Sequence, residues 1–308
     1  MFAAFLTTIL FSVSAVTANR VAKLLGGIEA NFWRLVCATV LLGIYAHSFG
    51  RGLGGNALGI FLVSGCIGFG IGDFAVFQAL PRLGSRLTIL LVQCLAAPIA
   101  ALVEWLWLGT VLSGAQMLCA VIILAGVALA LSPSQHLNLT PKQLVPGVLF
   151  GVLAAAGQAG GAVLSRVANA QLRQAGQEID GATAAYQRIL GGIVVIGVIF
   201  LINHQRKKLL PAPELLAAST FRAQANQRAV WPWIAVNALA GPTLGVSCYQ
   251  WALKTTQTGI VLPIVAITPL VIIPFARVFE GERPTRRSLA GGVLAVIGVV
   301  ALTLVTRR

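Results

Sequence analysis

Charged residues are scarce in this sequence, and acidic ones are the scarcest. Only 10% of the 308 residues are charged, against about 25% in a typical soluble domain, whereas 57% are hydrophobic. So few polar groups could not cover the surface of a soluble globular protein. The composition therefore excludes a soluble domain and indicates an integral membrane protein.

The excess of basic residues also fits a membrane. The chain has 22 Lys and Arg against 8 Asp and Glu, a formal net charge of +14. On a soluble protein this excess would suggest nucleic acid. Here the basic residues lie mostly between apolar stretches, where they meet lipid headgroups, and neither a basic patch interleaved with aromatics nor a zinc-finger spacing accompanies them. The lipid bilayer is therefore an expected partner, and nucleic acid is not.

Cysteine and histidine are too few and too scattered to predict a metal site or a disulfide framework. The five cysteines lie singly in apolar segments, and the three histidines fall in expected connections. We expect no metal and no cofactor. The N-terminal stretch lacks the basic start of a cleaved signal peptide, so it is expected to be the first spanning helix.

Ten apolar runs approach the roughly 20 residues that a helix needs to cross the hydrocarbon core. The expected spans are 2–18, 31–48, 57–80, 87–108, 113–131, 146–168, 183–202, 231–253, 258–279 and 288–305. A polar break with two prolines, Ser132 to Gln143, lies near the middle of the chain. We expect residues 1–131 and 146–308 to form two five-helix units, joined by a connecting loop at 132–145.

The two halves resemble each other in four places that follow in the same order. The paired stretches are ANFWRLVCATVLLG with AAYQRILGGIVVIG (which places Arg34 over Arg188), SAVTANRVA with GGAVLSRVA, FQALPRLGS with QWALKTTQT, and LGTVLSGAQMLCAVIILAGV with EGERPTRRSLAGGVLAVIGV. Such ordered matches indicate an internal repeat. Because five is odd, the second unit enters the membrane from the opposite face. Inverted repeats of this kind are typical of secondary transporters, which bind substrate near the midplane.

The second five-helix repeat ends in GERPTRRSLAGGVLAVIGVV, and the first has Ala79-Leu80 shortly after Gly72-Asp73. With these motifs, the two five-helix repeats resemble the EamA-type transporters of the drug/metabolite transporter superfamily. The resemblance covers nearly the whole chain. It implies an all-α integral membrane protein with ten transmembrane helices, arranged as two inverted five-helix repeats in the inner membrane. One departure is that Thr110 stands in the first half where Glu282 stands in the second.

A second departure concerns the first span. Small multidrug-resistance relatives of this superfamily carry a central glutamate there, whereas this sequence has Ser12, Ser14 and Thr17. The resemblance therefore disfavours drug-cation antiport by that route.

One carboxylate, Asp73, lies deep in an apolar run, behind three glycines in GFGIGDFAVFQALPRLGSR. Three interpretations compete: a phosphate-binding glycine loop, an intramembrane aspartyl protease, and a polar group inside a transporter. A protease needs two carboxylates that share a proton, and the only other aspartate, Asp180, lies outside the expected spans. A phosphate loop needs free backbone N–H groups, which a segment in lipid cannot leave unsatisfied. The transporter interpretation is therefore favoured.

An ionisable group in a span costs about 2.5–3.5 kcal/mol on insertion scales, so Asp73 is expected to face protein or water. Its functional roles would be proton coupling or contact with a substrate amine. The structural alternative is a buried carboxylate that pairs with an arginine and fixes packing. The neighbouring glycines form G-x-x-x-G faces at Gly68/Gly72, Gly147/Gly151 and Gly157/Gly161, which are expected to pack spans three and six tightly near the repeat interface.

The residues expected to bind substrate or couple transport are Asp73, Gln78, Gln93, Gln158, Tyr249, Gln250 and Trp251. For each of them, an interhelical hydrogen bond is the alternative. The prolines expected to break or hinge helices, because each removes a backbone hydrogen bond, are Pro98, Pro263, Pro269 and Pro274. Arg34 and Arg188, at the starts of spans two and seven, are interpreted as headgroup anchors.

Membrane orientation has two opposed predictions. Basic residues gather in the odd-numbered connections, which the positive-inside rule places in the cytoplasm, with both termini outside. The family resemblance implies that both termini lie in the cytoplasm. A reporter fused to either terminus separates these two predictions.

The sequence thus predicts a multi-pass transporter of the inner (cytoplasmic) membrane with no catalytic residue. It would export a small metabolite, such as an amino acid, by alternating access from a midplane site between the repeats. A monomer and a homodimer are both open. The alternative is an intramembrane enzyme, similar to an aspartyl protease, that uses Asp73.

Overall fold

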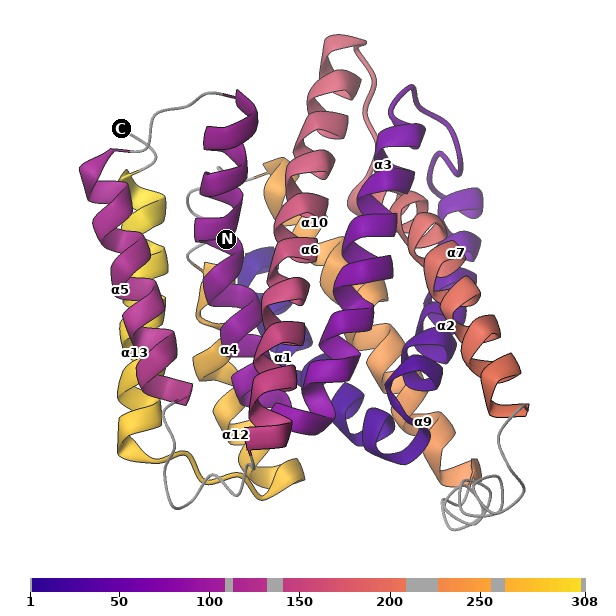
Figure 1. Ribbon diagram of the computed structural model, residues 1–308. Coiled ribbons are helices and arrows are strands. Elements are labelled where there is room, and N and C mark those ends of the chain that lie inside the picture. The colour runs from indigo at the N-terminus through magenta and orange to yellow at the C-terminus, as the bar shows by residue number, and fades with distance from the viewer. Residues whose placement is uncertain (1, 109–112, 132–140, 209–226, 256–263, 306–308) are drawn as a thin grey trace.

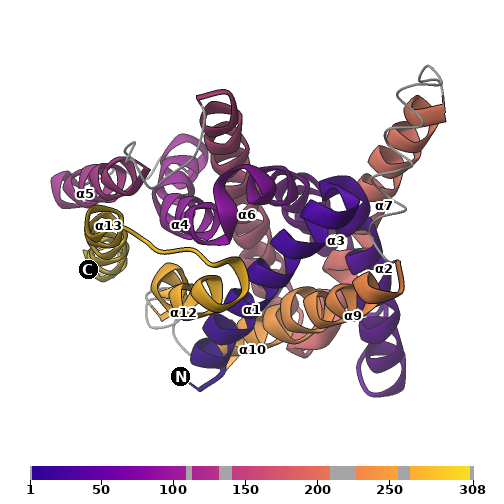
Figure 2. The same cartoon turned by 90° about the horizontal axis from the view of Figure 1, so that it is seen from below.

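The computed structural model describes residues 2–108, 113–131, 141–208, 227–255 and 264–305, and all regular secondary structure in these ranges is helical. The helices form one bundle, in which α5 and α13 pair at an edge (Figures 1 and 2). The elements are α1 (Phe2–Leu25), α2 (Gly27–Ser48), α3 (Leu58–Gly65), η1 (Cys66–Gly72), α4 (Asp73–Leu108), α5 (Gly114–Leu131), α6 (Pro141–Gln174), α7 (Gly181–Lys208), α9 (Gln227–Ala238), η2 (Leu239–Gly245), α10 (Val246–Thr255), α12 (Thr268–Glu280) and α13 (Arg286–Val305).

Within the described ranges, five helical stretches are long and apolar enough to cross a membrane. They are Phe2–Leu25, Gly27–Ser48, Leu58–Ala96, Lys142–Gln174 and Gly181–Arg206. Large apolar side chains such as Leu118, Leu149 and Val194 lie on the outside of the bundle, as a surface in contact with lipid requires. The protein is therefore a multi-pass membrane protein.

Other expected spans are interrupted helices. Gly84 has φ 78° and ψ 168°, a conformation suited to glycine, and it breaks α4 between the expected spans 57–80 and 87–108. The expected span 231–253 is made of α9, η2 and the beginning of α10 in series. The expected span 258–279 begins outside the described residues, and α12 starts at Thr268.

Two π-helical segments of seven residues, η1 and η2, lie at corresponding places in the two halves. The register that aligns Phe77 with Gln250 also aligns the first and the last residues of η1 with those of η2. η1 packs against α6 and α7, whereas η2 packs against α1 and α2. Each π-helical segment therefore packs on helices of the other half. π-helical segments are rare in proteins, and those that occur are often found at functional sites.

The G-x-x-x-G faces bring η1 and α6 into backbone contact. A Cβ atom at Gly157 would lie 2.6 Å from the Cα of Gly72, and one at Gly161 would lie 3.2 Å from the Cα of Gly68. Only glycine permits this approach. The predicted tight packing of spans three and six is thereby confirmed, and Gly147/Gly151 contact leucine side chains of α4.

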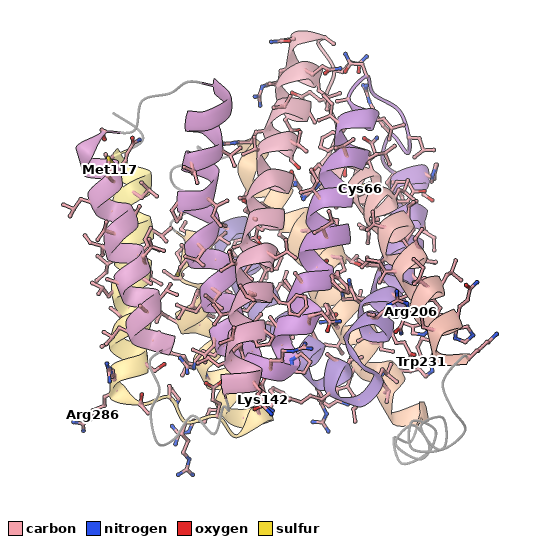
Figure 3. All side chains as sticks on the ribbon, in the orientation of Figure 1. Cys66, Met117, Lys142, Arg206, Trp231 and Arg286 are labelled. Atoms are coloured by element: carbon pink, nitrogen blue, oxygen red, sulfur yellow. The ribbon has the colours of Figure 1, made fainter. Side chains whose placement is uncertain are left out.

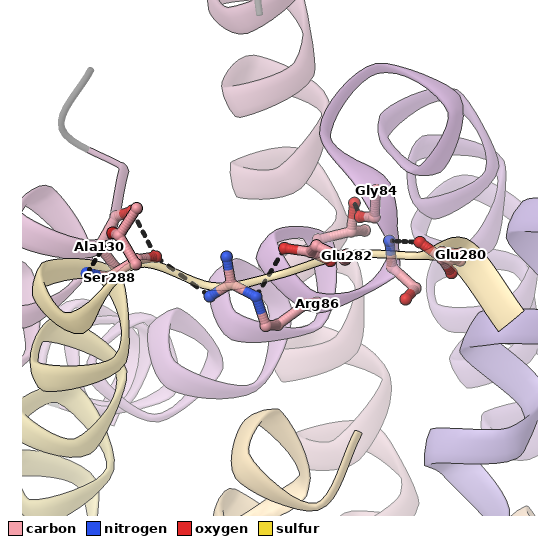
Figure 4. Close-up of polar contacts among 9 residues, drawn as sticks. Gly84, Arg86, Ala130, Glu280, Glu282 and Ser288 are labelled. Atoms are coloured by element: carbon pink, nitrogen blue, oxygen red, sulfur yellow. Dashed lines mark hydrogen bonds and ion pairs between the residues drawn. The ribbon is translucent and has the colours of Figure 1, made fainter. Parts of the chain in front are cut away.

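A polar network joins the two halves at one end of the bundle (Figure 4). Arg86, just after the Gly84 break, donates to the carboxylate of Glu282 (2.7 Å) and to the hydroxyl of Ser288 (3.1 Å). Ser288 in turn donates to the carbonyl of Ala130 at the end of α5 (3.0 Å). This network attaches α4 to the segment that links α12 and α13.

Basic residues from different connections lie toward the same end of the bundle. Lys142, Arg206 and Arg286 lie at one end, and Met117 and Cys66 lie nearer the other (Figure 3). The three basic residues belong to three different odd-numbered connections of the expected topology. Helices that cross the membrane in alternating directions place their odd-numbered connections on one face, which accounts for this common location.

Candidate functional site

A cavity of about 150 Å³ lies within the bundle, between helices of both halves. Most of its wall is apolar or aromatic, with Phe11, Phe69 and Phe77 among the lining side chains. The polar and charged residues that line it are Ser14, Arg34, Asp73, Gln93, Gln158, Arg188 and Tyr249. A mostly apolar pocket with a few convergent polar groups is the usual form of a small-molecule site.

Asp73 is ion-paired with Arg34 in this cavity. Asp73 directly follows η1, and its Oδ2 accepts a hydrogen bond from Nη2 of Arg34. The same nitrogen donates to Oδ1 of Asn31 (3.0 Å), and the guanidinium lies over the ring of Phe77, 4.8 Å from its centroid. The exposed fraction is 8% for the side chain of Arg34 and 22% for that of Asp73. The carboxylate therefore faces a cation rather than a second acid.

Among the described residues, the hydrogen-bond and ring partners of Arg188 are neutral, and its charge also interacts with that of Asp73, whose carboxylate is paired with Arg34. Its Nε donates to Oγ of Ser64 (3.0 Å), and its guanidinium lies 5.2 Å from the ring centroid of Phe69. Ser64 in turn donates to the carbonyl of Gly161 (2.7 Å). The ion pairs of the described residues include Arg34–Asp73 and Arg86–Glu282, and Arg188 belongs to neither of these two. The buried charge of Arg188 is thus held by a hydroxyl and an aromatic face.

The interpretation of Arg34 and Arg188 as headgroup anchors is wrong, because both side chains are buried and line the cavity. The reason is that α2 begins at Gly27 and α7 at Gly181, earlier than predicted. At 1.5 Å per residue, each arginine lies roughly 10 Å, about two turns, inside its helix. Their recurrence at matching positions in both halves was the sequence signal that could have identified them.

Four of the expected site residues meet at the cavity: Asp73, Gln93, Gln158 and Tyr249. Gln158 on α6 donates through Nε2 to Oε1 of Gln93 on α4 (2.8 Å). Gln93 is buried, which makes this bond a fixed part of the cavity wall. The remaining hydrogen-bonding capacity of the two amides is available to a ligand.

The other three expected residues lie away from the cavity wall. The amide oxygen of Gln78 accepts a hydrogen bond from Arg82 (3.2 Å). Gln250 is buried, and neither atom of its amide has a hydrogen-bond partner in the described structure. Trp251 is 50% exposed on the outside of the bundle.

The expected hinge prolines differ in their surroundings. Pro98 and Pro274 lie inside α4 and α12, whereas Pro263 lies outside the described residues. Pro269 opens α12 and cannot donate to the carbonyl of Val265, four residues earlier. The hydroxyl of Thr268 donates to that carbonyl instead (2.5 Å). The carbonyl that the proline frees is therefore satisfied within the protein.

Comparison with known proteins gives both distant relatives and a shared fold. Over 78 residues the chain is 36% identical to a protein of Pseudomonas paraeruginosa (strain DSM 24068 / PA7) and 37% identical to one of Pseudomonas aeruginosa (strain UCBPP-PA14). Each is named a probable 4-amino-4-deoxy-L-arabinose-phosphoundecaprenol flippase subunit ArnE. The match covers 25% of this chain and 65% of either relative, so the chain spans less than two thirds of their length.

A solved crystal structure shares the fold, with a TM-score of 0.59 at 21% identity over 99% of this chain and 96% of the other. The profile of the EamA-like transporter family matches residues 1–132 and 145–304, nearly the whole sequence. The chain therefore belongs to the EamA-like transporter family of the drug/metabolite transporter superfamily.

Proposed function

We propose that the protein is a secondary transporter of a small metabolite, which it moves across the cytoplasmic membrane by alternating access. The observation that carries this proposal is the charged cavity. Two arginines and one aspartate line a small space in an otherwise apolar bundle, where ionisable groups are costly and usually functional. The family supports a transport role for the cavity, and we propose export of a small polar metabolite such as an amino acid.

We propose further that the chain crosses the membrane ten times, as two inverted five-helix repeats. The matching positions of η1 and η2 support this arrangement, as does the match of the family profile in two stretches. In Figure 1, α3 leads downward into α4, whereas α9 leads upward into α10, so the corresponding segments run in opposite directions. The cavity would then lie between the repeats, where such transporters bind substrate.

The size of the cavity favours a small substrate. The Pseudomonas relatives are named for a lipid-linked aminosugar, a cargo much larger than a cavity of about 150 Å³ can enclose. A space of this size holds a molecule about as large as benzene. We therefore propose a small water-soluble substrate.

The surroundings of Asp73 speak against the alternative of an aspartyl protease. Proton sharing between two carboxylates requires a separation of about 3 Å. Asp73 instead contacts the guanidinium of Arg34, and Asp180 caps the first turn of α7, where its carboxylate accepts from the N–H of Ala182 and of Thr183. A charged pair inside a cavity suits ligand binding better than peptide hydrolysis.

Transport into proteoliposomes tests the proposal, with the wild type compared with Asp73→Asn and, as a matched control, Asp180→Asn. We expect Asp73→Asn to remain folded and lose counterflow of the substrate, and Asp180→Asn to retain it, because asparagine caps a helix about as well as aspartate does. Unchanged transport by Asp73→Asn would remove Asp73 from the mechanism. Cleavage of a helical reporter peptide by the wild type, lost in Asp73→Asn, would favour the enzyme.

A further inference from the structure

We propose that the substrate of this cavity is a small organic anion, whose acid group binds to Arg188. This inference rests on the proposed transport function, since it names the substrate class of the same site. It starts from the charges that line the cavity: Arg34, Asp73 and Arg188. Arg34 and Asp73 neutralise each other as an ion pair, which leaves the cavity with one positive charge.

That remaining charge is buried, and the two arginines share a single carboxylate: Asp73 pairs directly with Arg34 and interacts with Arg188 without forming an ion pair. Arg188 is 8% exposed, and its partners are the hydroxyl of Ser64 and the ring of Phe69. Burial of a cation without a counter-charge is strongly unfavourable. A substrate anion would supply the missing charge, and its interaction would be strong because water is largely excluded there.

Comparison of the two halves shows where the counter-charge is missing. Arg34 lies next to Gly241 of η2, and Arg188 lies next to Gly68 of η1, so the two arginines have matching surroundings. In the register of the repeat, however, Asp73 follows η1 and Val246 follows η2. The first half thus provides an acid for its own arginine, whereas the second half places an apolar residue at the corresponding position on the cavity wall.

The rest of the wall defines the other part of the substrate. Val246 belongs to the same apolar cluster as Phe69, over which Arg188 lies. The phenol of Tyr249 and the amides of Gln93 and Gln158 add hydrogen-bonding groups. The cavity of about 150 Å³ is comparable to an engineered cavity that binds benzene. A carboxylate or phosphate with a compact apolar remainder fits this combination.

The structural alternative is that Arg188 only fixes η1 against α6 and α7. Its bond to Ser64, which also bonds to Gly161, is compatible with such a role. In that case the arginine would bind no ligand, and its replacement would change stability without changing selectivity. Selectivity among ligands of equal size is therefore the property to measure.

The test is isothermal titration of the full-length protein in phosphatidylcholine nanodiscs, with benzoate, benzamide and benzylamine as probes of nearly equal size and different charge. Phenyl phosphate distinguishes a phosphate from a carboxylate. We expect benzoate or phenyl phosphate to bind at least roughly tenfold more tightly than benzamide, because charge-assisted hydrogen bonds are the strong ones. The same titration with added phosphatidylglycerol shows whether an anionic lipid competes for the site.

Two pairs of variants locate the anion. Val246→Asp supplies the counter-charge from the protein and is expected to abolish benzoate binding. Val246→Asn, which has the shape of the aspartate variant without its charge, is expected to retain a measurable preference for benzoate over benzamide. Arg188→Gln is expected to lose that preference. The exposed Arg51, changed to Gln in the same way, controls for net charge.

Equal binding of benzoate and benzamide by the wild type would overturn the inference, and so would tighter binding of benzylamine than of both anions. Benzoate binding that persists unchanged in Arg188→Gln would overturn it as well. Failure of the transport proposal would look different, because benzoate would bind selectively but would not cross the bilayer of proteoliposomes. Selective transport of a cation or neutral molecule would instead support the transport function and contradict the proposal of an anionic substrate.

Discussion

The segments η1 and η2 hold matching places in the two halves, but only η1 is followed by a charged residue. Asp73 follows η1 and pairs with Arg34, whereas Val246 follows η2 and provides no ion-pair partner for Arg188. The packing differs too, because the glycines of η1 meet the backbone of α6, while Gly241 of η2 meets the side chain of Ser14. A repeated framework can thus hold an unsymmetrical site.

The largest expected difference is between the two arginines. Arg34→Gln leaves Asp73 buried without its partner and should cost about 3 kcal/mol in the free energy of unfolding. Arg188→Gln removes an uncompensated charge along with one hydrogen bond and should cost under about 1 kcal/mol. Reversible unfolding in mixed micelles measures both. Equal losses would show that the two arginines have equivalent environments.

The packing of η1 and η2 should respond differently to an added methyl group. Gly157→Ala places a Cβ atom 2.6 Å from the backbone of Gly72, which cannot yield, and should cost about 2 kcal/mol. Gly241→Ala meets mainly the side chain of Ser14, which can rotate, and should cost about half as much. Gly197 has open space around it and provides the control, since alanine there should be neutral or stabilising. A costly Gly197→Ala would point to a general intolerance of the fold.

A third contrast concerns Glu282, whose counterpart in the first half is Thr110, outside the described residues. Glu282→Thr removes the acceptor for Arg86 and should cost about 1.5 kcal/mol. Glu282→Gln keeps an oxygen acceptor and should cost less. Thermal unfolding of both variants ranks them, and the reverse order would mean that the hydrogen bond from Arg86 to residue 282 does not stabilise the fold.

The smallest effect is expected at the start of α12. Thr268→Val removes the hydroxyl that satisfies the carbonyl of Val265, at a cost of about 1 kcal/mol. Thr268→Ser keeps the hydroxyl and should be close to neutral. If both variants unfold like the wild type, the hydrogen bond from Thr268 does not stabilise the start of α12.

The sequence predicts the helical membrane architecture well, because each apolar run must bury its backbone polar groups in a helix once it enters lipid. It also predicts the contact of Gly68 and Gly72 with α6, since spaced glycines permit only a few kinds of close packing. Asp73 stands out for a similar reason, as a single costly charge in an apolar run.

The partners of Asp73 are harder to predict. Arg34 and Arg188 lie near the ends of the apolar runs, where arginine is ordinarily an anchor, and only the true helix starts at Gly27 and Gly181 place them inside. The π-helical segments have no sequence signature beyond their glycines and Pro242. Gln250 and Trp251 were expected at the cavity, but a rotation of one residue on a helix turns a side chain by about 100°.

Accessibility of Gln158 tests the central claim most directly, because its side chain lines the cavity from α6. The five native cysteines, Cys37, Cys66, Cys94, Cys119 and Cys248, would be replaced, and Gln158→Cys would then be exposed in proteoliposomes to a thiol reagent that cannot cross the membrane. A transporter that alternates access predicts labelling from either face in turn and protection from both by a bound ligand. Labelling from one face only, unchanged by ligand, would contradict the account.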